Sequence, residues 1–427
     1  MKVLVVGSGA REHAIVRALG ADPAVDAVVV APGNPGMDVV TLCEPLPGGL
    51  LDGDGVVDLA RRHGVDLVVI GPEAPLVAGV ADVVREAGYA VFGPSAEAAR
   101  LEGSKAFAKE VMAAADVPTA LARVCSTADE VADALDAIGA PHVVKDDGLA
   151  AGKGVVVTND LDEAMAHARE CLAKEGGRVV VEEFLDGPEV SLFVLCDGET
   201  VVPLAPAQDF KRVGDGDAGP NTGGMGAYSP LDWAPADLAD QVLARVAQPT
   251  VDEMRRRGTP FSGVLFIGLA LTARGPRVIE FNARFGDPET QVVLARLQTP
   301  LGGLLMAAAT GHLAEVGALH WSDQHAVTVV VASHNYPGTP RTGDPVSGIE
   351  EATDVPTAYV LHAGTARADD GTLVSAGGRV LSVVALGDSL TQARERAYSA
   401  VGAIELEGSH HRTDIALAAE RDELHVG

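Results

Sequence analysis

The segment that most restricts the fold is 143–157, VVKDDGLAAGKGVVV, where two apolar runs flank a small-residue stretch. The valines at 143–144 and 155–157 are β-branched, which is typical of strands. Glycines let the backbone turn sharply and bring its N–H groups close to an anion. The segment therefore predicts a β-hairpin whose loop contacts phosphate, through Gly148, Gly152 and Gly154 with Lys145 and Lys153.

This loop is not a Walker A motif. The glycine after Gly148 comes too early for the GxxxxGK[ST] spacing, and neither Ser nor Thr follows Lys153. An ordinary surface hairpin is the alternative when the segment is taken alone.

Composition limits the classes of function. The 427 residues suggest about three domains, since single cores rarely grow beyond ~250 residues. The net charge of −28 argues against a nucleic-acid-binding surface, which needs clustered Lys and Arg, but still allows a local phosphate pocket.

Cysteine usage and hydropathy indicate a cytoplasmic protein. The four cysteines are scattered without a CxxC pair, so neither a zinc site nor a disulfide framework is expected. The first apolar run is too short for a signal peptide, and none reaches the ~18 residues of a membrane span.

The N-terminal pattern predicts a doubly wound parallel sheet. An apolar strand at 2–7 leads through a glycine turn into an amphipathic helix at 10–19. Gly7 and Gly9 begin a GxGxxG motif, but Glu12 occupies the third glycine position, which argues against a dinucleotide-dependent dehydrogenase. The helix N-terminus with Arg11 can still hold one phosphate.

Glycine- and proline-rich loops follow the next predicted strands, at 31–36 (APGNPG), 71–76 (GPEAPL) and 93–95 (GPS). In a parallel sheet such loops converge at the carboxyl ends of the strands, where substrates bind. The alternative is that Gly-Pro simply ends each strand. Asn34 and Glu73 stand in otherwise apolar loops, and this favours a substrate site.

The middle of the chain predicts a mobile lid and a functional loop. Helices at 127–138 and 159–174 flank the hairpin, and strands within 178–187 and 190–195 complete a compact unit. Such a unit can close over phosphate and exclude water. The segment 207–230 is polar, glycine-rich and long, which is usual for a functional loop.

A second hairpin, at 263–271 and 277–281, ends in a candidate metal site. Alternate residues of a strand share a face, so Glu280 and Asn282 should point the same way. Their oxygens suit Mg²⁺ carried on a nucleotide, and Arg284 and Asp287 follow in the next turn.

Nine segments together resemble the phosphoribosylamine–glycine ligase (glycinamide ribonucleotide synthetase) family of the ATP-grasp superfamily, and they run nearly end to end. They are GSGAREHA (7–14), APGNPG (31–36), GPEAPL (71–76), LEGSKAF (101–107), KDDGLAAGKGV (145–155), EEFLDGPE (182–189), KRVGDGDAGPNTGGMGAYSP (211–230), EFNARFGDPETQ (280–291) and HAGT (362–365).

The resemblance implies a mixed α/β and α+β multidomain fold. The expected parts are an N-terminal α/β domain (1–101), an ATP-grasp domain (102–312, lid about 120–187) and a C-terminal α+β domain (313–427). It also implies the second step of purine synthesis, in which glycine, 5-phosphoribosylamine and ATP give glycinamide ribonucleotide, ADP and phosphate through glycyl phosphate. A monomer that acts on small molecules, with no nucleic-acid or membrane partner, is expected.

The resemblance also assigns roles to residues. ATP would be held by Lys105, Lys145, the 148–154 loop, the strand Glu182, Glu183, Phe184 and Leu185, and Glu189. The metal, Mg²⁺ or Mn²⁺, would be held by Glu280 and Asn282. Catalysis would use Lys145, Arg284 for the transferred phosphate or glycine carboxylate, and Asp209 for glycine. The substrates would be held by Gly9, Arg11, Glu12, Asn34, Glu73, Lys211, Asn221, Gly223 and Gly224.

The sequence departs from the family pattern in three places. Asp146 stands where alanine is expected, and Phe210 where histidine is expected. Asp146 should face away from Lys145, because adjacent strand residues point to opposite sides. Segment 264–271 offers no acid before the metal pair, so the metal would rely more on ATP oxygens and water.

Two alternatives remain. One is a related ATP-grasp ligase with another acceptor, which the 207–230 segment and the N-terminal loops disfavour. The other is a regulatory protein that binds nucleotide without turnover; Lys105, Lys145, Glu280, Asn282 and Arg284 together argue against it.

Overall fold

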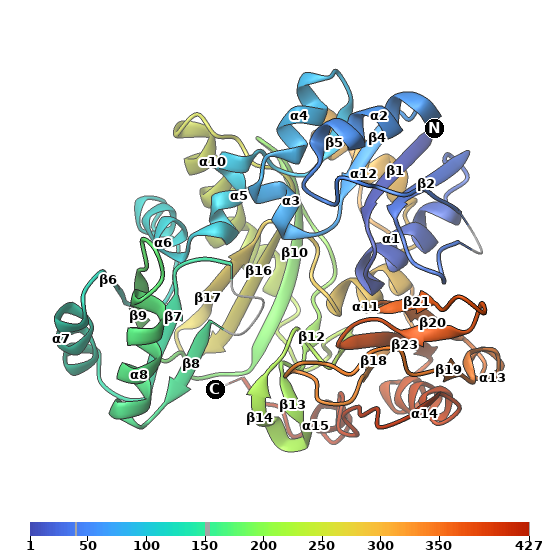
Figure 1. The fold of residues 1–427 in the computed structure, drawn as a ribbon. Coiled ribbons are helices and arrows are strands. Elements are labelled where there is room, and N and C mark those ends of the chain that lie inside the picture. Colours follow the sequence, from blue (N-terminus) through green and yellow to red (C-terminus); the bar gives the residue numbers. More distant parts are fainter. Residues whose placement is uncertain (39–40, 150–153, 427) are drawn as a thin grey trace.

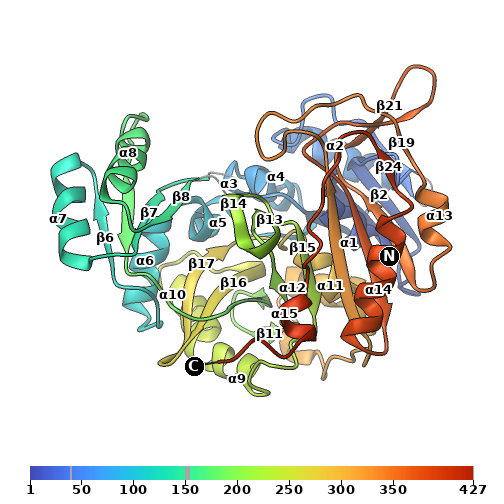
Figure 2. The same ribbon diagram turned by 90° about the horizontal axis from the view of Figure 1, so that it is seen from below.

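The computed structural model describes residues 1–38, 41–149 and 154–426. An N-terminal α/β layer, a central sheet and a C-terminal sheet lie together, while a smaller unit projects from one side, at the left of both views (Figures 1 and 2). Among the described residues no helix is both long and apolar enough to span a membrane.

The N-terminal layer is the predicted doubly wound sheet. Its five parallel strands have the order β3-β2-β1-β4-β5. Strand β1 is buried almost throughout because helices cover both faces of the sheet. The strands are β1 (Lys2–Gly7), β2 (Ala27–Pro32), β3 (Leu42–Cys43), β4 (Leu67–Ile70) and β5 (Ala90–Phe92); the helices are α1 (Ala10–Gly20), α2 (Gly53–His63), α3 (Glu73–Val77), α4 (Val80–Glu86) and α5 (Ala96–Gly103).

The lid is a four-stranded antiparallel sheet of order β6-β9-β7-β8, with two helices on one face. The predicted hairpin is present: β7 pairs with β8 from His142 opposite Thr158 to Lys145 opposite Val155. Helix α7 begins with a capping box formed by Thr127 and Glu130. The elements are β6 (Ala122–Cys125), α7 (Ala128–Ile138), β7 (His142–Asp146), β8 (Val155–Thr158), α8 (Leu161–Leu172) and β9 (Val179–Glu182).

Two expectations about the lid are corrected. The apolar run at 190–195 belongs to the central sheet, where β10 pairs with β16 over nine residues, and not to the lid. The edge strand β6 was missed, because two of its four residues are exposed and it carries little strand-type alternation.

The central sheet has the order β11-β10-β16-β17 and includes the predicted second hairpin, formed by β16 and β17. Pro300 immediately precedes α12 and separates it from α11. The elements are α6 (Lys105–Ala114), β10 (Glu189–Asp197), β11 (Val201–Pro203), α9 (Leu238–Val242), a π-helical turn (Leu243–Ala247), α10 (Gln248–Arg256), β16 (Ser262–Thr272), β17 (Gly275–Asn282), α11 (Glu289–Arg296), α12 (Leu301–Thr310) and a 3₁₀ turn (Leu313–Glu315).

The C-terminal sheet corrects the expectation of one long loop at 207–230. Its order is β12-β15-β18-β23-β20, so two strands from that segment pair into it. Strand β15 is fully buried, and its pairing with a strand on each side compensates for the weak strand signal of glycine-rich sequence. This region contains β12 (Gln208–Asp209), β13 (Arg212–Gly214), a 3₁₀ turn (Asp215–Asp217), β14 (Ala218–Asn221), β15 (Gly226–Ser229), β18 (His325–Ala332), β20 (Ala358–His362) and β23 (Arg379–Gly387).

Smaller elements complete the C-terminal region. Helix α14 packs on β18 and β23 and supplies the buried Ala393, Ala397 and Ala400. The remaining elements are β19 (Val346–Ser347), α13 (Ile349–Thr353), β21 (Thr365–Arg367), β22 (Leu373–Ser375), α14 (Leu390–Val401), β24 (Glu405–Leu406) and α15 (Leu417–Glu420).

Candidate active site

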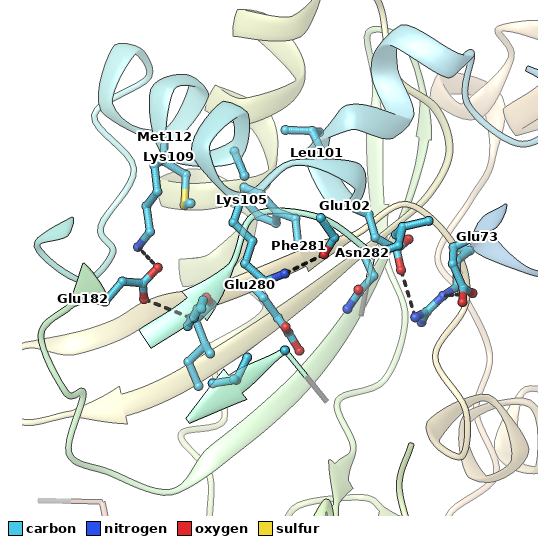
Figure 3. A pocket seen from close by; sticks show the side chains of 18 residues that line it. Glu73, Leu101, Glu102, Lys105, Lys109, Met112, Glu182, Glu280, Phe281 and Asn282 are labelled. Atoms are coloured by element: carbon cyan, nitrogen blue, oxygen red, sulfur yellow. Dashed lines mark hydrogen bonds and ion pairs between the residues drawn. The ribbon is translucent and has the colours of Figure 1, made fainter. Parts of the chain in front are cut away.

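A cleft lies where the lid meets the central sheet (Figure 3). Helices α5 and α6 form one wall, β7 and the ends of the hairpin loop form another, and β17 supplies the floor. Gly148 and Gly154 line it, as the phosphate-loop prediction requires. Gly152 and Lys153, predicted in the same loop, lie outside the described residues.

Three lysines reach this cleft. Lys105, the first residue of α6, donates to the Gly148 carbonyl at 3.0 Å, and Lys145 donates to the Ile279 carbonyl at 3.0 Å. Lys109, one turn beyond Lys105, was not predicted as a site residue. Burial lowers the pKa of Lys105, and it lowers the pKa of Lys109 to about 8. The lysines thus stand largely desolvated around the cleft, beside the carboxylates of Glu182 and Glu280.

The predicted metal pair lies on the floor. Glu280 and Asn282 both line the cleft from β17 (Figure 3). Burial acts to raise the pKa of Glu280, but the charges of Lys211, Lys145 and Lys105 outweigh it, so the net shift is downward. The carboxylate is therefore ionised and able to ligate a cation.

No group of three or more His, Cys, Asp or Glu side chains suited to a metal occurs within the described ranges. A cation on Glu280 and Asn282 would therefore complete its shell with nucleotide oxygens and water, as the missing acid on β16 suggested.

Arg284 is fixed by two carboxylates. Its Nη2 lies 2.9 Å from Glu102 Oε1, and its Nε donates to Glu73 Oε2 at 3.2 Å. Burial acts to lower the pKa of Arg284, but Glu102 and Glu73 reverse this and hold it above its usual value. Glu102 was not predicted; it also accepts from the Ala283 N–H at 2.8 Å. Arg284 thus faces the cleft as a permanent, oriented cation.

The predicted substrate residues of the N-terminal layer lie next to Glu73. Arg11 contacts Glu12 at 2.5 Å, donates to the Phe285 carbonyl at 3.1 Å and lies 4.0 Å from Glu73. Glu12 in turn accepts from the Gly9 N–H at 2.7 Å. The chain of charges therefore links the loop after β1 with the end of β17, as converging strand ends predicted.

Asp209 and Lys211 lie in a cluster of acidic side chains. Lys211 is 2.6 Å from Glu189 Oε2 and 4.0 Å from Glu280 Oε1. Burial raises the pKa of Asp209 to about 8, against the opposing charge of Lys211. Glu289, which was not predicted, is buried and accepts from Ser191 Oγ at 3.0 Å, and burial raises its pKa as well.

Asn34 lies apart from the cleft and is fully hydrogen-bonded within the protein. Its amide donates to the carbonyls of Ser8 (2.8 Å) and His362 (2.9 Å), and its oxygen accepts two backbone N–H groups. It links the N-terminal layer to β20.

Gly223 and Gly224 are held by Arg379, another residue that the sequence did not single out. Its Nη1 donates to the Gly223 and Asp287 carbonyls at 2.8 Å each. Gly224 has φ +112° and packs against Pro288, so only glycine fits there. Asn221 pairs with Arg212 in the β13–β14 ribbon.

The predicted adenine strand leaves β9 at Glu182. The Glu182 side chain is buried between two lysines, and Glu183 accepts from the Leu121 N–H at 3.0 Å. Phe184 is exposed and Leu185 half-buried. Glu189, predicted to contact ribose, is exposed beside Lys211.

Two of the three departures from the family pattern, Asp146 and Phe210, have local explanations. Asp146 faces away from the cleft, as expected, but its carboxylate is buried and paired with Lys174. Phe210 packs under the guanidinium of the buried Arg412, whose carbon lies 4.8 Å from the ring centre.

The residues missed by sequence reasoning are Glu102, Lys109, Glu289 and Arg379. Lys109 lies one turn after Lys105 on α6, and this i, i+4 spacing was an available signal. Glu102 stands inside the LEGSKAF segment, at the end of α5 and before the break at Ser104. Glu289 and Arg379 gain their neighbours only through the tertiary fold.

Three family models match the chain. They are the N domain of phosphoribosylglycinamide synthetase (residues 1–102), its ATP-grasp (A) domain (103–290) and its C domain (326–418).

Curated relatives and solved structures agree with these models. Phosphoribosylamine–glycine ligase of Streptomyces coelicolor is 69% identical over 98% of this chain and 99% of its own length, and that of Mycobacterium leprae is 57% identical over 100% of both. The crystal structure of the Thermotoga maritima ligase superposes with a TM-score of 0.83 at 32% identity, covering 97% of this chain and 100% of that one. A biotin carboxylase from Campylobacter jejuni, at 12% identity and TM-score 0.70, covers 98% of this chain and 95% of its own and shares the fold alone.

Proposed function

The chain belongs to the phosphoribosylglycinamide synthetase family, an ATP-grasp ligase family, and on this premise we propose that it joins glycine to 5-phosphoribosylamine through glycyl phosphate. ATP would be converted to ADP and phosphate, and the product would be glycinamide ribonucleotide, an intermediate of purine biosynthesis. The observation that carries the proposal is the cleft that gathers Lys105, Lys145, Arg284, Glu280 and Asn282.

Binding of the nucleotide phosphates is assigned to the desolvated lysines. Phosphoryl transfer depends mainly on positioning and charge neutralisation, so preorganised cations suffice without a nucleophilic side chain. Lys105 and Lys145 would contact the phosphates, and the hairpin loop would cover them. The backbone of 182–185 would receive adenine, where the exposed Phe184 offers an apolar surface.

Mg²⁺ or Mn²⁺ would be held by Glu280 and Asn282, whose oxygen donors fit either ion. When bound, the metal would neutralise charge on the nucleotide phosphates. Lys211 lies 4.0 Å from Glu280, and its charge also favours the ionised carboxylate.

The reaction would proceed in two balanced steps. A carboxylate oxygen of glycine attacks the γ-phosphorus of ATP, the bond to ADP breaks, and glycyl phosphate forms. The amine of phosphoribosylamine then attacks the carbonyl carbon and loses a proton, and phosphate leaves with the original glycine oxygen. Arg284, held by Glu73 and Glu102, would stabilise the negative charge that develops on the transferred phosphate.

The two substrates would approach from opposite sides of Arg284. Asp209 would accept the glycine ammonium, while Gly9, Arg11, Glu12 and Glu73 would hold phosphoribosylamine at the strand ends of the N-terminal layer. The chain of contacts from Glu12 through Arg11 and Glu73 to Arg284 supports this arrangement of the substrates, because it connects the N-terminal layer directly to the cleft.

The testing experiment uses glycine labelled with ¹⁸O in both carboxylate oxygens, with ATP, Mg²⁺ and phosphoribosylamine generated in place. We expect ADP release that requires both substrates, and one ¹⁸O atom in each phosphate released, measured by mass spectrometry. Unlabelled phosphate would refute the glycyl phosphate step.

Substitution of each substrate separates the alternatives. Release of ADP with another amine or carboxylate, but not with this pair, would identify a related ligase. ATP binding without any release would identify a regulatory binder. The expected monomer and cytoplasmic location remain predictions, and size-exclusion chromatography with light scattering tests the first.

A further inference from the structure

Two lysines share one buried carboxylate at the inner end of the cleft. Glu182 Oε1 lies 3.1 Å from Lys109 Nζ, and Glu182 Oε2 lies 2.9 Å from Lys145 Nζ. All three side chains are largely desolvated, with 4% of the Glu182 side chain, 11% of Lys109 and 6% of Lys145 exposed. Figure 3 shows Lys109 and Glu182 facing each other beside the cleft.

The two lysines differ in how firmly they are held. An ammonium has three N–H donors. Lys109 has three acceptors: Glu182, Thr119 Oγ1 at 2.8 Å and the Ala120 carbonyl at 3.3 Å. Lys145 has two recorded acceptors within the described ranges, Glu182 and the Ile279 carbonyl. Lys109 is therefore anchored by residues 119–120 as well as by Glu182, while Lys145 keeps a donor for a ligand.

We propose that Lys109 is a positioning residue that keeps Glu182 paired when Lys145 turns toward a nucleotide phosphate. Two cations share the Glu182 carboxylate, so one can turn to the phosphate of ATP while the other stays paired. Without Lys109, Lys145 would be the one remaining ion-pair partner of Glu182 among the described residues, and its transfer to phosphate would strand that charge. This inference rests on the ATP-binding part of the proposed function.

The burial of Lys109 gives the arrangement a pH dependence. Burial lowers the pKa of Lys109 to about 8, with the Glu182 charge opposing that shift and the Lys145 charge adding to it. Lys105, Arg277 and Glu280 are the other charged groups near the three residues. Lys109 is thus charged at pH 7 and loses its proton as pH rises through 8. Because neutral Lys109 no longer balances Glu182, nucleotide affinity should fall as pH rises through 8.

The test measures binding of the non-hydrolysable analogue adenylyl imidodiphosphate with Mg²⁺ by calorimetry, on the full chain without glycine. We expect Lys109→Met to raise the dissociation constant about tenfold or more. Lys109→Arg should restore most of the affinity and remove the fall in affinity above pH 8. Lys174→Met is the matched control, because Lys174 pairs with Asp146 in the same lid and not with Glu182. That control should remain within twofold of the wild type.

Glu182→Gln completes a double-mutant cycle. With a neutral amide at position 182, no buried charge is left unpaired when Lys145 turns to the phosphate, so adding Lys109→Met should change affinity by less than twofold. If Lys109→Met alone fails to fold, the double variant can still be compared with Glu182→Gln, because neither protein contains an unpaired carboxylate at position 182. Equal losses in both backgrounds, or no loss in either, would overturn the proposal.

Kinetics separate this role from a general loss of structure. Lys109→Met should raise the KM for ATP and leave the KM values for glycine and phosphoribosylamine nearly unchanged, whereas partial unfolding would lower kcat alone. If the wild-type chain binds no nucleotide, the proposed function fails; if it binds and Lys109→Met binds equally well, only this inference fails.

Discussion

At the scale of single residues, the candidate site is a balance of buried charges. Glu280 is ionised because three lysines outweigh the effect of its burial, and Arg284 is fixed because two carboxylates hold it. Each charge therefore depends on partners from other parts of the chain.

Glu280→Ala tests the metal assignment. The substitution removes the only carboxylate of the proposed pair, so we expect kcat to fall by at least about 10²-fold, in the range seen when one electrostatic group is lost. The melting temperature should remain close to that of the wild type. Glu199→Ala, at an exposed carboxylate paired with Arg255, serves as the control. A near-normal rate for Glu280→Ala would refute the assignment.

Asp209 allows a pH prediction. Because burial raises its pKa to about 8, the carboxyl is largely protonated at pH 7 in the free protein. An arriving glycine ammonium favours the ionised form, so binding at pH 7 should release a proton. As pH rises well above 8 the group is already ionised and the release should vanish.

Calorimetry in two buffers of different ionisation enthalpy measures this proton release. Asp209→Asn should abolish the release and weaken glycine binding. If glycine binds the wild type at pH 7 without release, Asp209 does not receive the ammonium.

At the scale of elements, the site is positioned by the ends of strands and helices. Helix α6 begins at Lys105, β9 ends at Glu182 and β17 ends at Asn282, so three element ends meet in one cleft. Packing between elements therefore controls the geometry of the cleft. Two adjacent glycines in α12 show that the space left by packing can differ from one residue to the next.

Gly302 and Gly303 form a matched pair. A Cβ on Gly302 would lie 2.8 Å from Val25 Cγ2 and 2.9 Å from Asp22 Oδ2, whereas one on Gly303 would meet nothing within 4 Å. Gly302→Ala should therefore lower the free energy of unfolding by about 1–3 kcal/mol, the usual cost of overpacking. Gly303→Ala should raise it by about 0.5–1 kcal/mol, since alanine favours a helix.

Urea denaturation of the two variants measures these changes. Equal effects at the two positions would show that contact between α12 and the N-terminal layer does not limit the space at Gly302.

At the scale of the whole molecule, distant segments complete each other's sheets. Strand β18 pairs with β15 from residues 226–229 on one side and with β23 on the other. The buried Asn34 joins the N-terminal layer to β20. The C-terminal sheet therefore depends for its pairing on strand β15, which comes about a hundred residues earlier in the chain.

A fragment of residues 313–427 should not fold by itself. It lacks β12 and β15, so the edge of β18 would be unpaired and its buried side chains exposed to water. We expect weak, non-cooperative thermal transitions by circular dichroism. Residues 1–102, which contain all five strands of their own sheet, are the comparison. A cooperative transition in the C-terminal fragment would contradict the prediction.

Much of the fold and part of the site could be predicted from the sequence. The buried strands of the N-terminal sheet, the 143–157 hairpin and the β16–β17 hairpin were predicted because apolar periodicity and glycine turns are local signals. Strand β15 and the true place of β10 were not, because the pairing that stabilises a strand comes from distant chain.

By itself the sequence determined the residue types that the chemistry needs: lysines beside a glycine loop, a Glu and an Asn on one strand face, and an arginine in the turn that follows. Only the tertiary structure decided which charges meet. Lys109 and Lys145 are 36 positions apart yet share Glu182, and Glu102 meets Arg284 across 182 positions. Ion pairing depends on distance and burial, which follow from packing of the whole chain rather than from local pattern.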